Sequence, residues 1–130
     1  DYDRAYFILK IFHEFLYSDY SIESVDKFLY KLEQLSTYYK QAINRYGISA
    51  KDLTYLYDYI DSGQLPCPHD FYLKKFIDFL KDGKTYCKYD LVILDESQDA
   101  NPCFVSLLKH LRAKNLQNFP LRKLRILIRR

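Results

Sequence analysis

The sequence of 130 residues has no methionine and no tryptophan, and it contains only three cysteines. Cys67, Cys87 and Cys103 are odd in number and widely spaced, which argues against both a disulfide framework and a zinc site. We therefore expect reduced, structural thiols without a disulfide partner. Because the chain begins at Asp1 and lacks methionine, we expect it to be a piece of a longer protein.

Long apolar runs are also missing. No window is apolar enough to span a bilayer, and no charged-then-apolar signal segment opens the chain. We expect no membrane partner and an intracellular location, which would be cytoplasmic in a prokaryote and nuclear in a eukaryote. The content of 48% hydrophobic and 28% charged residues is typical of a globular chain of one domain's size.

Acidic residues are absent from the last part of the chain. Residues 109–130 carry eight basic side chains and no acid, while the whole chain has a net charge of +3. The basic residues are Lys109, Arg112, Lys114, Arg122, Lys123, Arg125, Arg129 and Arg130. Such a tail suggests contact with phosphate or another acidic partner. The alternatives are a solvated tail that keeps the protein in solution and the frayed end of a cut domain.

The first half of the chain has helical periodicity. We expect helices over residues 4–17, 22–46 and 50–62, which together predict one helical subdomain. Ser21 and Ser49 are suitable N-caps, and Gly47 and Gly63 are suitable ends. The expected inward residues are Ile8, Phe12, Leu16, Val25, Phe28, Leu29, Leu32, Leu35, Tyr39, Ala42, Ile43, Leu53, Leu56, Tyr57 and Ile60. His13 falls on the polar side of its helix, where no second metal ligand has matching spacing.

Tyrosine is abundant, with 14 residues. Many of these lie in the helical half, at Tyr30, Tyr38, Tyr39, Tyr46, Tyr55, Tyr57 and Tyr59. Tyrosine rings can stack on single-stranded bases. At helical spacing they can equally form the edge of a core.

The stretch YDLVILDESQDANP, residues 89–102, carries the chemistry of this sequence. Residues 91–94 are an unbroken apolar run, which suits a strand buried on both faces in a parallel sheet. The run ends at Asp95 and Glu96, and Asn101-Pro102 predicts that a helix follows. A strand, two carboxylates and a helix are the parts of a magnesium–nucleotide site, in which one carboxylate holds Mg²⁺ and the next orients the attacking water.

Two other interpretations of this stretch stay open. The carboxylates can be a solvated acidic turn after a core strand. A metal-dependent nuclease would use Asp90, Asp95 and Glu96, but no lysine follows at the expected two-residue spacing.

The string Asp95-Glu96-Ser97-Gln98-Asp99, followed by Asn101-Pro102, resembles the D-E-x-Q-D motif of UvrD/Rep-type superfamily-one DNA helicases. The F-box DNA helicase branch is the most similar, because it carries an H-D-x-Y-L-K segment upstream that resembles residues 69–74. Together the two motifs cover roughly residues 66–112. After about residue 113 the sequence departs from the family, since it has no G-D-x-x-Q motif.

This resemblance implies an α/β fold. Residues 66–130 would be part of the first RecA-like P-loop NTPase motor domain, and residues 1–65 would be a mainly helical insertion subdomain. It also implies ATP and Mg²⁺ as cofactors. Asp95 would bind Mg²⁺, Glu96 would activate the attacking water, and Gln98 would contact the nucleotide and link its state to the DNA. Asp99 would hold the local hydrogen-bond network.

The resemblance further places His69, Asp70 and Tyr72 near single-stranded DNA, at the start of a helix expected over residues 71–81. The inward residues of that helix would be Leu73, Phe76, Ile77 and Leu80. The alternative is that Asp70 only caps this helix. Gly83-Lys84-Thr85 looks like the end of a phosphate loop, but Asp78 stands where that motif needs its first glycine.

We therefore expect a fragment of an ATP-dependent DNA helicase, whose partners are single-stranded DNA and the remainder of the motor. Because the chain lacks a phosphate loop, it should be inactive alone. The alternative is a non-catalytic single-stranded DNA-binding or interaction module, which would use the tyrosines and the basic tail.

Overall fold

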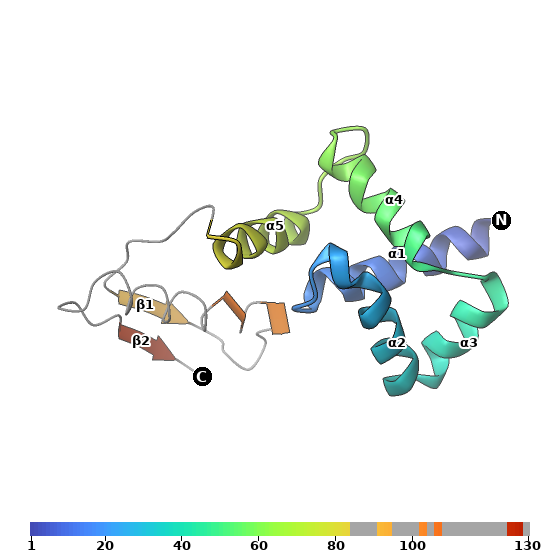
Figure 1. The fold of residues 1–130 in the computed structure, drawn as a ribbon, viewed down its shortest axis with the longest axis horizontal. Helices are drawn as coiled ribbons and strands as arrows, with labels where there is room; N and C mark the ends of the chain where they lie inside the picture. Colours follow the sequence, from blue (N-terminus) through green and yellow to red (C-terminus); the bar gives the residue numbers. More distant parts are fainter. Residues whose placement is uncertain (84–90, 95–101, 104–105, 108–124, 129–130) are drawn as a thin grey trace. The chain divides into compact units, whose positions relative to one another are not determined.

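The computed structural model describes residues 1–83, 91–94, 102–103, 106–107 and 125–128 (Figure 1). The chain divides into two compact units, Asp1–Tyr72 and Leu73–Arg130. The division falls inside a helix, whereas the sequence placed a domain boundary after residue 65, in the loop before that helix. Each unit is described by itself.

The first unit is a bundle of short helices (Figure 1). In order along the chain they are α1 (Tyr2–Tyr17), the 3₁₀ turn η1 (Ile22–Ser24), α2 (Val25–Leu35), α3 (Thr37–Tyr46), α4 (Ala50–Asp61) and the start of α5 (His69–Lys81). Helix α1 packs against α3 and α4, and α2 packs against the same two helices. The three predicted helical regions of residues 1–65 are therefore confirmed as helical.

Local sequence explains where these helices begin and end. At the start of α4, the Asp52 carboxylate accepts a hydrogen bond from the Ser49 backbone N–H at 2.9 Å, as part of a reciprocal capping box. Helix α3 ends at Gly47, whose φ of 61° lies in the left-handed region that favours glycine. Both predicted signals are confirmed.

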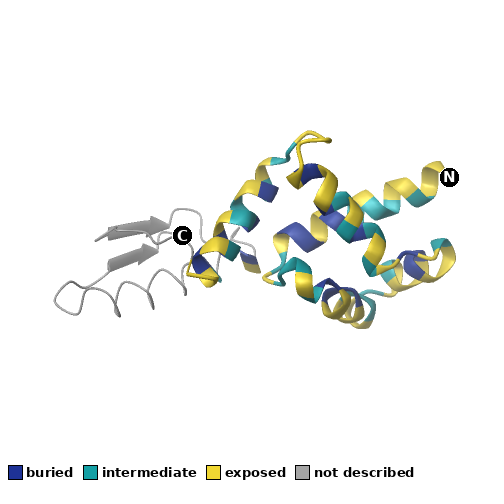
Figure 2. Ribbon diagram, turned by 45° about the horizontal axis from the view of Figure 1, so that its top comes forward, coloured by how far each residue is buried: buried dark blue, intermediate teal, exposed yellow. Residues whose placement is uncertain are grey.

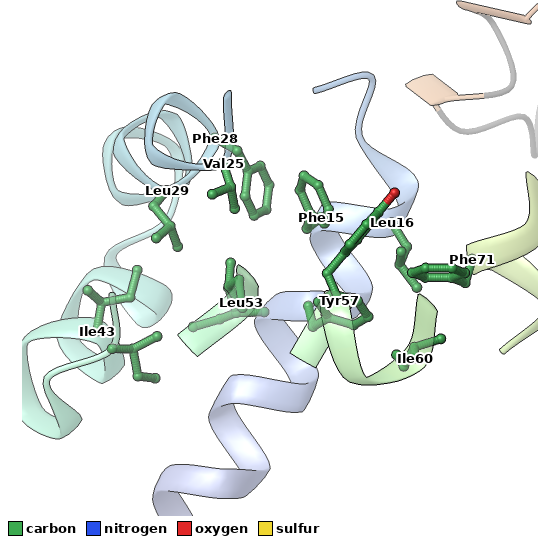
Figure 3. Close-up of a cluster of buried hydrophobic side chains, with 13 residues drawn as sticks. Phe15, Leu16, Val25, Phe28, Leu29, Ile43, Leu53, Tyr57, Ile60 and Phe71 are labelled. Carbon is green, nitrogen blue, oxygen red and sulfur yellow. The ribbon is translucent and has the colours of Figure 1, made fainter. Parts of the chain in front are cut away.

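The core of the first unit is aliphatic and aromatic (Figure 3). Its buried members are Ile11, Phe12, Phe15, Leu16, Val25, Phe28, Leu29, Ile43, Ile48, Leu53, Tyr57, Ile60 and Phe71. They come from every helix of the unit, so each amphipathic helix buries its apolar stripe against the others (Figure 2). His13 is exposed, as its position on the polar side predicted.

The predicted single helix over residues 22–46 is wrong. Ser36 has an extended backbone, with φ −138° and ψ 112°, and it separates α2 from α3. Its side-chain oxygen accepts a hydrogen bond from the Tyr39 backbone N–H, so Ser36 starts a new helix instead of continuing the old one. As a result Leu35, expected to face inward, is 74% exposed.

Helix α5 begins at His69, two residues before the predicted start. In the second unit, Ile77 and Leu80 pack with Cys103 and Leu107, and Leu73 lies against this cluster. Phe76 was expected on the buried side but is 39% exposed. The buried residues on either side of it are Lys74 and Ile77, and the burial of Lys74 was not expected.

Two short strands, β1 (Leu91–Leu94) and β2 (Arg125–Ile128), also belong to the second unit. They pair in parallel, and the register places Leu91 opposite Arg125 and Leu94 opposite Ile128. Strand β1 occupies the unbroken apolar run of the sequence. Between the strands, residues 102–103 and 106–107 are helical.

The expected α/β, RecA-like fold is wrong for the part of the chain that the structure describes. Helices dominate it and form a bundle-like fold. A pair of four-residue strands is not the multi-stranded sheet, covered by helices on both faces, that defines such a domain. The expected fold failed because it was implied by a resemblance that rests on short motifs, and one strand with a helix-start signal after it does not make a multi-stranded sheet.

Among the residues described, no helix combines the length and the apolar character that a membrane-spanning segment requires.

Candidate functional site

The acidic motif that carries the expected chemistry lies outside the described residues. This holds for Asp95, Glu96 and Gln98, and also for Asp90 and Asp99. What the structure describes is the strand that leads into the motif. Strand β1 ends at Leu94 and pairs in parallel with β2, so the two carboxylates follow directly in the chain after the end of a parallel strand.

The residues expected near DNA, His69, Asp70 and Tyr72, all lie in the first turn of α5. His69 and Tyr72 are exposed, and Asp70 is half-buried. The Asp70 carboxylate lies close to the Tyr17 hydroxyl at the end of α1. Its negative charge, together with burial and a hydrogen bond from Tyr17, raises the pKa of that tyrosine. Asp70 therefore has a structural partner within the first unit, and a carboxylate also suits the first turn of a helix.

Tyr72 has a structural partner as well. The pKa of Tyr72 is raised, mainly by a hydrogen bond with the Cys67 thiol and to a smaller extent by the charge of that group. The Cys67 thiol in turn donates to the Pro68 carbonyl at 3.8 Å. These contacts tie the loop before α5 to its first turn. The role of His69, Asp70 and Tyr72 in binding DNA stays a prediction.

No metal-binding group emerges among the residues that the structure describes. None of their histidine, cysteine, aspartate and glutamate side chains gather in threes with a geometry that could hold an ion. Cys67 and Cys103 are free thiols, Cys67 half-buried and Cys103 buried. The expected magnesium ligand Asp95 lies outside the described residues, so the metal site stays a prediction.

Helices α1 and α3 form an aromatic and cationic surface that sequence reasoning missed in part. The Lys10 Nζ atom lies 5.6 Å from the ring centre of Tyr6 and 5.0 Å from that of Tyr38. It donates a hydrogen bond to the Tyr38 hydroxyl at 3.2 Å, and this bond raises the pKa of Lys10. The i, i+4 spacing of Tyr6 and Lys10 on α1 was the available signal. The contribution of Tyr38 depends on how α1 and α3 pack.

Lys74 is the second feature that the sequence did not reveal. It is only 2% exposed, and it is the one charged side chain that is buried among the described residues. Its position three residues after Phe71 and three before Ile77 places it on the buried stripe of α5. Because a buried ammonium is costly without a partner, charged lysines are rarely placed there. Lys74 does have interactions within the protein.

Comparison of this chain with protein-family models, with curated proteins and with solved structures gives no match.

Proposed function

We propose that this chain is part of an ATP-dependent DNA helicase, to which it contributes the carboxylates that hydrolyse Mg²⁺-ATP. The observation that carries the proposal is the string Asp95-Glu96-Ser97-Gln98-Asp99, which begins at the residue after β1. The string also follows directly in the chain after the carboxyl end of β1, which pairs in parallel with β2.

In this proposal three residues of the string, Asp95, Glu96 and Gln98, act on the nucleotide and its metal ion. Asp95 holds Mg²⁺, for which carboxylate oxygen is a preferred ligand. Glu96 orients and deprotonates the water that attacks the γ-phosphate. Gln98 contacts the nucleotide and connects its state to the DNA-binding face. The bound Mg²⁺ would neutralise charge that develops on the phosphate oxygens.

The chain of 130 residues should not hydrolyse ATP alone, because its sequence contains no phosphate loop to grip the β- and γ-phosphates. The residues that supply this loop, and the arginine fingers of a second motor domain, would belong to the longer protein. Such fingers contribute about 10³ to 10⁵ in rate in nucleotide hydrolases. Turnover of ATP by the isolated chain that disappears in Glu96→Gln would contradict this expectation.

The experiment that tests the proposal uses the whole helicase to which this chain is proposed to belong and measures DNA-stimulated ATP hydrolysis. Glu96→Gln keeps the size of the side chain but removes the base, so kcat should fall by about 10² to 10⁴. Glu23→Gln, an exposed position in η1, is the matched control and should leave kcat unchanged. Equal kcat values for the Glu96→Gln variant and the unmodified protein would refute the role of Glu96.

A second candidate function is a non-catalytic module that binds single-stranded DNA. The observation that favours it is the solvent exposure of Tyr6 and Tyr38 in the first unit, since each side chain is about half exposed. Exposed aromatic rings are the common platform for single-stranded bases. The basic residues of the sequence from 109 to 130 would add contacts with phosphate. Binding that weakens steeply with salt, and is lost when those residues are neutralised, would support this function.

A further inference from the structure

The surface between α1 and α3 places one ammonium group between two tyrosine rings. Tyr6 is 52% exposed and Tyr38 is 50% exposed, and the Lys10 Nζ atom lies within 5.6 Å of both ring centres. We call Tyr6, Lys10 and Tyr38 the Tyr-Lys surface. All three residues belong to the first unit, so the surface is complete within one compact body.

The rings of the Tyr-Lys surface are supported by Phe7. The Phe7 ring lies 5.3 Å from Tyr6 at an angle of 79° and 5.8 Å from Tyr38 at 56°. It also stacks on Tyr46 at 5.3 Å and packs against the core of the unit. The two exposed rings are therefore held before any ligand arrives, which lowers the entropy lost when they bind one.

The charge near this surface is positive only locally. Helix α3 has Lys40 and Arg45 and no acidic residue, and Arg45 lies 5.4 Å from the ring centre of Tyr46. Residues 1–72 nevertheless contain seven Lys and Arg against eleven Asp and Glu, and the nearby Glu14 accepts a hydrogen bond from Tyr39 at 3.3 Å. A ligand of this surface must therefore be recognised mainly by its flat groups, with few ionic contacts.

We propose that the Tyr-Lys surface binds single-stranded nucleic acid, with bases stacked on Tyr6 and Tyr38 and Lys10 in contact with a phosphate. This inference rests on the second candidate function and names its site. A duplex offers no unstacked bases to the rings. An apolar protein partner would have to bury the Lys10 ammonium without a countercharge, which is costly, whereas a nucleic acid supplies both the flat bases and the phosphate.

The test is fluorescence anisotropy with the full chain and a labelled oligo(dT) strand of about 16 nucleotides in about 50 mM salt. Tyr6→Ala and Tyr38→Ala should each weaken binding about tenfold, because each variant loses the stacking of one base. Lys10→Gln should weaken it less and reduce the slope of log K against log salt by about 0.7, as expected for one phosphate contact.

Matched controls come from the same unit. Tyr30 on α2 and Tyr55 on α4 are 67% and 64% exposed, so Tyr30→Ala and Tyr55→Ala remove rings of equal size. Both should leave the affinity unchanged within about twofold. Tyr6→Phe should retain binding, because the ring remains. If an alanine variant loses helicity, Tyr6→Leu and Tyr38→Leu keep apolar contact with Phe7 without a flat ring, and the same tenfold loss is expected.

Each contrary outcome has a distinct meaning. If the chain binds oligo(dT) but the Tyr6 and Tyr38 variants bind equally well, the Tyr-Lys surface is not the site, although the binding function stands. If the control variants lose as much affinity as these two, the surface has no special role. If the chain does not bind oligo(dT) even at about 50 mM salt, both the surface and the binding function are refuted. The helicase proposal is tested separately through Glu96.

Discussion

The ion pair between Arg4 and Asp52 connects the start of α1 to the start of α4. The Arg4 Nη2 atom lies 3.0 Å from both carboxylate oxygens of Asp52, and Arg4 Nε donates to the Tyr46 carbonyl at 2.9 Å. Asp52 also accepts from the Ser49 backbone N–H. One arginine thus joins α1 to the end of α3 and to the capping box of α4, so we expect its removal to destabilise the first unit.

The magnitude follows from these contacts. The arginine side chain is 38% exposed, so the ion pair itself should contribute only about 0.5–1 kcal/mol after screening by solvent. The hydrogen bond to the Tyr46 carbonyl adds about 1 kcal/mol, so Arg4→Ala should cost about 1.5–2 kcal/mol. Asp52→Ala removes both the ion pair with Arg4 and the hydrogen bond that caps α4, and the cap alone should contribute about 1 kcal/mol to the free energy of unfolding. Asp52→Asn keeps an oxygen acceptor for Ser49, so it should cost only about 0.5–1 kcal/mol.

The assay is urea unfolding of the full chain, followed by far-UV circular dichroism. A double-mutant cycle with Arg4→Ala and Asp52→Ala should give a coupling free energy of about 0.5–1 kcal/mol. If Arg4→Ala lowers the free energy of unfolding equally in the unmodified chain and in the Asp52→Ala variant, the ion pair does not stabilise the unit. If Asp52→Asn costs as much as Asp52→Ala, the explanation through the capping box is wrong.

This pair also predicts a pH dependence. Burial alone would raise the pKa of Asp52, but hydrogen bonds from Ser49 and the guanidinium of Arg4 outweigh it and hold the pKa below its usual value. A carboxyl group with a lowered folded-state pKa stabilises the fold above its unfolded pKa of about 3.9. The stability that Asp52 contributes should therefore be complete at neutral pH and disappear as pH falls from about 4 through the folded-state pKa. The difference between the unmodified chain and Asp52→Asn should shrink in that range.

Substitutions at Leu53, Gly47 and Ser36, each compared with a second variant, test the packing and the helix ends by the same unfolding measurement. Leu53 is fully buried in the core of the first unit, so Leu53→Ala should lower the free energy of unfolding by about 2–5 kcal/mol. Leu35 is exposed, so Leu35→Ala should change it by less than about 0.5 kcal/mol. Equal effects would show that the core is misassigned. Gly47→Ala should lower the free energy of unfolding by about 1–2 kcal/mol, because the left-handed backbone at this position disfavours a Cβ atom. The space around Gly47 is open, so steric overlap adds nothing. Gly47→Asn should lower it less, because asparagine tolerates this conformation better. An unchanged Gly47→Ala variant would contradict this conformation. Ser36→Ala should cost about 1 kcal/mol through loss of the α3 cap, and Thr37→Ala serves as its neighbouring control; a neutral Ser36→Ala would indicate that α2 and α3 do not depend on that cap.

Signals that act within one helix were sufficient to predict much of the first unit. Ser49 with Asp52 and the glycine at Gly47 set helix ends through contacts a few residues apart, and all three were predicted. Ser36 shows the limit of this reasoning. The apolar stripe continues on both sides of it, and the periodicity of residues 22–46 does not show that its hydroxyl caps a new helix.

Features that depend on contacts between helices were not predictable. Lys74 sits on the buried stripe of α5, although its charge predicts exposure. The Tyr-Lys surface needs Tyr38 of α3 beside Lys10 of α1, which are 28 residues apart. The RecA-like fold failed for a related reason, because it was inferred from a short motif. A motif of a few residues specifies chemistry, whereas the fold depends on the packing of the whole chain.

The most direct test of the proposed helicase function is the nucleotide sequence of the native transcript on both sides of the segment that encodes residues 1–130. The proposal predicts a G-x-x-x-x-G-K-T phosphate loop upstream and a G-D-x-x-Q motif downstream, both in the same reading frame. A start codon directly before Asp1 and a stop codon directly after Arg130 would contradict it. In that case Asp95 and Glu96 could not belong to a motor, and single-stranded DNA binding would be the remaining proposal.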